Sequence, residues 1–159
     1  MATYERESWV RAPLEEVWEF HAGIDGLLAL TPEWMNLRVE RVVGPHGERD
    51  PDVLDVGASV DLSVRPFGVG PRRRWRSEIT EREREPGVAY FRDVMRDGPF
   101  PEWEHTHLFY GEGERTLCRD RLVFRTPAGP FAPVGDELAK AFLDGFFRCR
   151  HRRLRERLE

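Results

Sequence analysis

The 159-residue chain has few of the features that would place it in several common protein classes. Its two cysteines, Cys118 and Cys149, form no CxxC pattern, so the sequence indicates neither a disulfide framework nor a zinc site built on cysteine. No apolar run approaches the roughly 20 residues that span a bilayer, and the N-terminal residues are charged. We therefore expect a soluble, cytoplasmic protein.

Lysine is also nearly absent, because Lys140 is the only one among 25 basic residues. The net charge of −4 does not favour generic binding to nucleic acid, and we expect no nucleic-acid partner. No glycine-rich phosphate loop, nucleophile elbow or HExxH helix occurs. The length, and the lack of a linker between two apolar cores, predict a single domain covering residues 1–159.

What the chain does have is a long series of segments in which apolar and polar residues alternate. Short helices are expected after the first strand, in residues 14–23 and 24–32. Strands are expected in residues 3–10, 34–43, 57–68, 72–85, 88–96, 103–110 and 116–127. From Asp136 to Glu159, apolar residues recur at helical spacing and predict one helix about 35 Å long. The pattern is therefore six or seven antiparallel strands in series, followed by a long helix.

Four stretches carry a resemblance to a known family: APLEEVWEF, LTPEW, DGPFPEWEHTHLF and FFRCRHRRLRERL. With the order of the elements, they resemble the SRPBCC superfamily, also described as START-like or Bet v 1-like, and in particular its bacterial polyketide cyclase/dehydrase-like members. The resemblance implies an α+β helix-grip fold, a curved antiparallel sheet of six or seven strands wrapped around the C-terminal helix, with a hydrophobic pocket between them. The superfamily includes lipid binders, aromatic cyclases and modules that act on macromolecules, so the fold alone does not select a function.

The segment WEHTHLF places His105 and His107 two positions apart in a predicted strand. If residues 111–114 form a two-residue hairpin turn with Gly111 opposite Glu114, then His105 faces Asp120 and His107 faces Cys118. Side chains alternate along a strand, so both histidines and Asp120 are expected on the inward face.

Three interpretations of these histidines compete. They can be hydrogen-bonded polar groups in the wall of an otherwise apolar pocket, or an acid–base pair in which Asp120 orients His105. They can also be metal ligands together with Asp120 or Cys118, but zinc sites usually show a recognisable spacing and a third strong ligand. We favour the first interpretation, keep His105 and Asp120 as candidate catalytic residues, and predict no metal and no cofactor.

Our leading hypothesis is a protein that binds a small hydrophobic molecule, aromatic or lipid-like, between the sheet and the C-terminal helix. The alternative is a cofactor-independent cyclase/dehydrase-type enzyme. A module that contacts RNA, the ribosome or a membrane, through Arg72–Arg76 or the C-terminal arginines, ranks third, and we also consider a homodimer. The predicted ligand-binding residues are Trp34, Trp75, Tyr90, Trp103, His105, His107, Phe109, Asp120, Leu122, Phe142 and Phe146.

Overall fold

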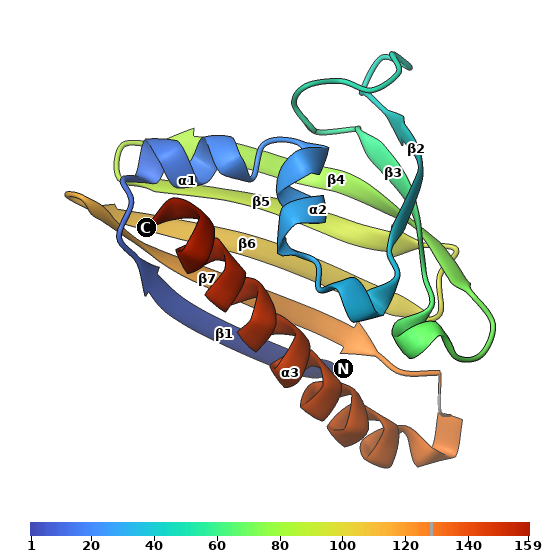
Figure 1. Cartoon of the computed structure of the whole chain (residues 1–159). Helices are drawn as coiled ribbons and strands as arrows, with labels where there is room; N and C mark the ends of the chain where they lie inside the picture. The colour runs from blue at the N-terminus through green and yellow to red at the C-terminus, as the bar shows by residue number, and fades with distance from the viewer. Residues whose placement is uncertain (128) are drawn as a thin grey trace.

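A seven-stranded antiparallel sheet forms the framework of the molecule (Figure 1). The computed structural model describes residues 1–127 and 129–159. The strands are β1 (Ala2–Val10), β2 (Arg38–Val43), β3 (Ser59–Val64), β4 (Arg73–Glu85), β5 (Val88–Arg96), β6 (Glu102–Glu112) and β7 (Arg115–Arg125). They lie in the order β1-β7-β6-β5-β4-β3-β2, so the first strand pairs with the last while the others pair with their neighbours in the chain.

Three α-helices cover one face of this sheet, α1 (Leu14–Phe20), α2 (Ile24–Leu30) and α3 (Ala132–Leu158). Figure 1 shows α3 running diagonally across the sheet, with α1 and α2 beside it. Helix α3 begins at Ala132 rather than at the predicted Asp136, because its first turn accommodates Pro133, where a missing N–H breaks no helical hydrogen bond. The seven strands, two short early helices and long C-terminal helix confirm the predicted helix-grip architecture.

The helix packs against the sheet through one of its two predicted apolar rows. Leu143, Phe147 and Leu154 are at most 4% exposed, whereas Leu138 and Phe142 on the other row are 69% and 43% exposed. Leu143 and Phe147 join Tyr4, Leu122 and Phe124 in one core cluster. No helix within the described ranges is long and apolar enough to cross a membrane.

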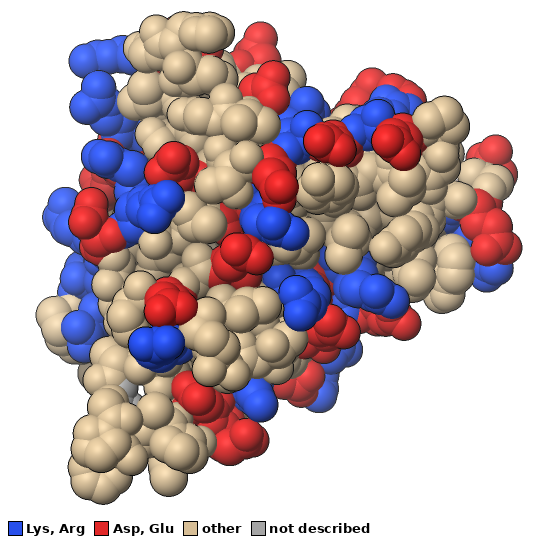
Figure 2. Space-filling view, turned by 180° about the vertical axis from the view of Figure 1, so that it is seen from behind, with Lys and Arg blue, Asp and Glu red and all other residues tan. Residues whose placement is uncertain are grey.

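The opposite face of the sheet carries paired charges. Arg119 lies 2.9 Å from Glu7 and Arg121 lies 3.0 Å from Glu5, across the β1–β7 ladder. Figure 2 shows basic and acidic side chains interspersed over the face seen from behind. Arg76 of the predicted basic stretch also pairs with Asp61, at 2.8 Å. Binding to RNA, the ribosome or a membrane stays a prediction. The ion pair between Arg76 and Asp61 offsets part of the positive charge that such binding would use.

The hairpin that joins β6 and β7 turns one residue later than predicted. Gly111 pairs with Thr116, and Glu112 with Arg115, so the turn residues are Gly113 and Glu114. Gly113 has φ +61°, the conformation that a type II′ turn requires at its first central residue. The predicted pairing of Gly111 with Glu114 was therefore wrong, and every partner on β7 moves by two residues. A shift of two leaves every side chain on the predicted face.

Candidate functional site

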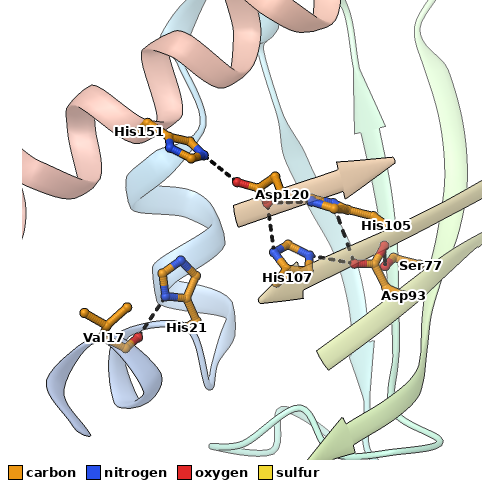
Figure 3. Close-up of polar contacts among 8 residues, drawn as sticks. All are labelled: Val17, His21, Ser77, Asp93, His105, His107, Asp120 and His151. Carbon is orange, nitrogen blue, oxygen red and sulfur yellow. Dashed lines mark hydrogen bonds and ion pairs between the residues drawn. The ribbon is translucent and has the colours of Figure 1, made fainter. Parts of the chain in front are cut away.

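Polar side chains from four elements meet at one buried point between the sheet and α3 (Figure 3). Asp93 comes from β5, His105 and His107 from β6, Asp120 from β7, and His151 from α3. The ladder places Asp93 opposite His105, and His107 opposite Asp120. Because paired residues in a sheet point to the same side, all four strand residues face the helix.

Asp120 is the acceptor at the centre of this arrangement. Its Oδ1 lies 2.6 Å from His105 Nε2, and its Oδ2 lies 2.6 Å from His151 Nε2. An ionised carboxylate only accepts hydrogen bonds, so both Nε2 atoms carry a hydrogen and donate. The Nδ1 of His151 then accepts from the Ser8 hydroxyl at 2.6 Å. The predicted His105–Asp120 contact therefore exists, although Asp120 lies diagonally across from His105 rather than directly opposite.

Asp93 forms the second acceptor of the site. His107 Nε2 lies 3.0 Å from Asp93 Oδ2, and the Ser77 hydroxyl donates to Asp93 Oδ1 at 3.2 Å. The Nδ1 of His105 lies 3.9 Å from the same Oδ2. The two imidazole rings pack against each other at a tilt of 30° with centroids 3.6 Å apart, and Phe91 stacks on the other side of His107 at 3.9 Å. Packing on both sides holds the His107 ring in place.

Burial and hydrogen bonding shift the pKa values of these groups in opposite directions. Burial raises the pKa of Asp120, but the hydrogen bonds from His105 and His151 outweigh it and hold the pKa well below its usual range. The pKa of Asp93 is likewise lowered, because the His107 hydrogen bond and the charge of His105 outweigh burial. Burial, together with the nearby charge of His105, lowers the pKa of His107 to about 4. Both carboxylates are thus ionised, and His107 is neutral, at physiological pH.

Arg150 adds a positive charge above this cluster. The residue is 7% exposed, and its guanidinium carbon lies 5.7 Å from the Phe146 ring and 5.8 Å from the Phe147 ring. Burial lowers its pKa, and the charges of Asp120 and Asp93 oppose that change. Arg150 follows Phe146 by four positions and Phe147 by three, a helical spacing that brings its side chain against both rings.

Two adjoining cavities lie beside the cluster. The inner cavity, of about 160 Å³, is bounded at its polar end by Asp93, His105, His107 and Arg150. The outer cavity, of about 320 Å³, has an almost wholly apolar wall that includes Leu37, Val64, Pro99 and Phe100. The two share the wall residues Leu27, Leu62, Trp75, Met95, Trp103 and Phe146.

Six of the predicted ligand-binding residues line these cavities. Trp75, Trp103 and Phe146 border both cavities, the two histidines border the inner one, and Phe142 borders the outer one. Trp34 stacks on Phe67 with ring centroids 4.8 Å apart, and its ring meets Phe142 and Phe146 edge-on.

The other four predicted residues lie elsewhere. Tyr90 is on the far side of the sheet, because it pairs with Leu108, whereas Phe91 pairs with the inward-facing His107. Phe109 and Leu122 are at most 2% exposed and belong to the core. Asp120 lies between His151 and the two histidines of β6 rather than in the wall of the inner or outer cavity (Figure 3).

Sequence reasoning missed Asp93, His151 and Ser8. A signal existed for the first, because Asp93 alternates with Ala89, Phe91 and Met95 in an otherwise apolar row. His151 follows Phe147 by four positions and precedes Leu154 by three, the spacing of the buried row of α3. Ser8 gives no such signal, because its contact with His151 joins residues 143 positions apart.

Comparison with known families decides the relationship of the chain. The model of the family described as polyketide cyclase / dehydrase and lipid transport matches residues 10–147. The chain belongs to this family. The predicted SRPBCC relationship is thereby confirmed, while a search of the curated proteins finds no match for the chain.

Solved structures of similar fold include the following three proteins. TTHA0849 from Thermus thermophilus shares 21% identity and a TM-score of 0.69 over 99% of this chain and 97% of its own. Norcoclaurine synthase from Thalictrum flavum, solved with dopamine and hydroxybenzaldehyde, shares 12% identity and a TM-score of 0.64 over 98% and 84%. The di-domain ARO/CYC BexL, from the BE-7585A biosynthetic pathway, shares 16% identity and a TM-score of 0.64 over 98% of this chain and 46% of its own. These similarities establish the shared fold.

The site gives this polyketide cyclase/dehydrase family member three chemical capacities. Arg150 can donate hydrogen bonds to an oxygen atom at the polar end of the inner cavity. His105 Nδ1, on the nitrogen opposite its Asp120 bond, can accept a proton. Asp93, His105 and His107 offer an oxygen and two nitrogens that lie within 4.8 Å of one another, a donor set of the kind that binds divalent metal ions.

Proposed function

We propose that this family member binds a small, mostly apolar molecule with a ring system and one carbonyl or hydroxyl oxygen, oriented with the oxygen toward the polar end of the inner cavity. The observation that carries the proposal is the pair of adjoining cavities between the sheet and α3. Their shared wall of Trp75, Trp103, Phe146 and three aliphatic or thioether side chains suits a flat apolar body.

Arg150 supports the presence of an oxygen on the ligand. No hydrogen bond or ion pair holds its guanidinium among residues 1–127 and 129–159, although the side chain is buried and borders the inner cavity. The nitrogens of Arg150 are not among the sealed, unpaired polar atoms of the core, so a ligand carbonyl oxygen in the cavity would be within their reach as a hydrogen-bond acceptor. Asp93 and Asp120 interact with Arg150 through their charges but accept no hydrogen bond from it. Their oxygens instead accept hydrogen bonds from Ser77 and the histidines.

The proposal is tested with two ligands that differ by one oxygen, α-tetralone and tetralin, titrated against tryptophan fluorescence. The ketone should bind about fivefold more tightly, because one hydrogen bond contributes on the order of 1 kcal/mol. Arg150→Met keeps the length of the stem and removes the donors, so it should abolish the difference between the two ligands. It leaves no protein acceptor newly unpaired.

Two further variants serve as controls for the location. Ala139→Phe adds a ring to the wall of the outer cavity and should weaken binding of both ligands. Tyr90→Phe, on the far side of the sheet, should leave both affinities unchanged. The proposal would be contradicted if the wild type bound the two ligands with equal affinity. It would also be contradicted if Ala139→Phe bound both ligands as tightly as the wild type does.

A second candidate function is dehydration of a β-hydroxy ketone, favoured by the 2.6 Å His105–Asp120 hydrogen bond, which leaves His105 Nδ1 as a free acceptor. Nδ1 would take the proton from the carbon next to the carbonyl. The β-hydroxyl would leave with that proton as water, and an unsaturated ketone would form.

The aldol adduct of benzaldehyde and acetone is a suitable substrate, since its dehydration product absorbs in the near ultraviolet. Wild-type protein should produce this absorbance and His105→Gln should not, while both still bind α-tetralone. Binding by the wild type without turnover of the adduct would leave only the ligand-binding function.

A further inference from the structure

Asp93, His105 and His107 have the arrangement of an incomplete coordination sphere. They come from adjacent strands, β5 and β6, and their donor atoms all lie within 4.8 Å of one another. Bonds of about 2.0–2.2 Å to a divalent transition metal place neighbouring ligand atoms about 3.0–3.6 Å apart. His107 Nε2 and Asp93 Oδ2 are already at 3.0 Å, and His105 Nδ1 lies 3.9 Å from the same oxygen. A small rotation of the His105 ring would close the wider gap.

Asp120 orients both rings for such a role. His105 donates from Nε2 to Asp120 Oδ1 at 2.6 Å, which leaves Nδ1, the atom near Asp93, unprotonated in the neutral ring. His107 has its Nδ1 at 3.4 Å from the same Oδ1, so its Nε2 is the atom directed toward Asp93. Metal-binding histidines usually direct their second nitrogen to a carboxylate, which fixes the tautomer and the ring orientation. Here one carboxylate serves both histidines, and it is held from behind by His151, which is itself hydrogen-bonded to Ser8.

The charges at this point also favour a cation. Asp93 and Asp120 place two carboxylates at this point, and Arg150 is the one guanidinium that borders the inner cavity within the described ranges. The carboxylates therefore outnumber the guanidinium, and their side chains are only 16% and 13% exposed. A divalent ion between Asp93 and the histidines would balance this excess of carboxylates and take the place of the His107–Asp93 hydrogen bond.

We propose that Asp93, His105 and His107 bind one divalent first-row transition metal ion, such as Zn²⁺ or Fe²⁺, with the remaining coordination positions open to the inner cavity. Two imidazole nitrogens and one carboxylate oxygen on one side of a metal, with open positions opposite, suit these ions and exclude Mg²⁺ and Ca²⁺ as preferred occupants. The site goes beyond ligand binding in the cavity. Asp93 is the third ligand of this site, and it is not adjacent in sequence to the His105-Thr106-His107 segment.

Cobalt is the probe that tests the site directly. The full chain, without an affinity tag and freed of metal by a chelator, is titrated with Co²⁺ in the absence of any organic ligand. We expect one Co²⁺ per chain with visible d–d absorption bands, displacement of those bands by Zn²⁺, and a rise in Tm on adding Zn²⁺. Proton NMR of the Co²⁺ form should show two strongly shifted exchangeable imidazole N–H signals, one each from His105 and His107.

Variants separate this site from adventitious binding. Asp93→Asn and His107→Gln should lose the absorption bands and the rise in Tm. Asp120→Asn, which alters only the residue behind the ligands, should weaken Co²⁺ binding about 10–100-fold. His46→Ala removes an exposed histidine and should change nothing.

Two results would overturn the proposal. One is the absence of shifted imidazole signals in the wild-type Co²⁺ spectrum, a measurement that requires no variant to fold. The other is retention of full Co²⁺ affinity in Asp93→Asn. Neither result bears on the tetralone titration, which is carried out on metal-free protein, so failure of the metal site and failure of the ligand-binding function are distinguishable.

Discussion

The two faces of the sheet use opposite charges in different ways. On the outer face, arginines and glutamates pair across strands in contact with water, as in Arg119 with Glu7, whose side chains are 36% and 50% exposed. On the inner face, His105 and Asp120 are also partners, but their side chains are only 9% and 13% exposed. Water screens the outer pairs and competes for their hydrogen bonds, so they contribute little individually. The inner groups have little access to water as a hydrogen-bond partner. The tautomer and ionisation state of each group therefore depend on its neighbours in the cluster.

The largest contrast between the faces should appear when a central acceptor is removed. Asp120→Ala leaves the Nε2–H groups of His105 and His151 without their acceptor in a buried position, and we expect a loss of about 3–5 kcal/mol in the free energy of unfolding. Urea denaturation monitored by far-UV circular dichroism measures it. Asp120→Asn, of the same shape, should lose less. A loss below about 1 kcal/mol in Asp120→Ala would show that the inner pairs contribute no more to the free energy of unfolding than the outer ones.

His21 sharpens the contrast through acid sensitivity. Burial lowers its pKa in the folded state to about 3, against the opposing effect of its hydrogen bond to the Val17 carbonyl; the charged groups that face it are His107, Asp120 and Arg150. In the unfolded chain the pKa is about 6.5, so below that pH the unfolded state binds the extra proton first. Stability should therefore fall as the pH decreases from about 6.5 to about 3, by up to about 1.4 kcal/mol per pH unit from this group.

The measurement is urea denaturation of wild type and His21→Gln at pH 7, 5 and 4. The variant should lose stability less steeply between these pH values, because glutamine does not titrate. Parallel losses in the two proteins would assign the acid sensitivity to other groups.

The smallest effect is expected on the outer face. Glu7→Ala removes the partner of Arg119 but leaves the guanidinium in water, so the free energy of unfolding should change by about 0–1 kcal/mol. High salt should reduce even that difference, because exposed pairs are screened. Stability curves of wild type and variant at low and high salt are the test. A loss comparable with that of Asp120→Ala would remove the distinction between the two faces.

The sequence predicted the fold and the inward-facing side chains because both depend on local periodicity. Alternation along residues 103–110 placed both histidines on the inner face, and that placement remains correct despite the error in the turn because the error shifts the pairing by two. The apolar row of α3 was visible for the same reason. The identity of the acceptors was harder to predict, since Asp93 and His151 reach the histidines through pairing and packing between separate elements.

The predicted cavity wall shows the same limit. Tyr90 was included because it is aromatic and lies in a strand next to WEHTHLF, but composition does not say which side of a strand a residue occupies. Its neighbour Phe91 is the inward residue, as the pairing with His107 shows. Arg150 lies among other arginines, a composition typical of a solvated helix face, yet the residue is only 7% exposed. Its four-residue spacing from Phe146 was the better guide.

The pairing of β1 with β7 has a consequence for how the protein is made. During synthesis β1 emerges first, yet its partner strand is complete only after Arg125, and the Ser8–His151 contact requires α3 as well. Until then the growing chain has unpaired strand edges and an uncovered apolar face, a state that favours aggregation and chaperone binding. Contacts so distant in sequence also slow folding. The cluster of histidines and carboxylates therefore cannot be complete until α3 has been synthesised and has packed on the sheet.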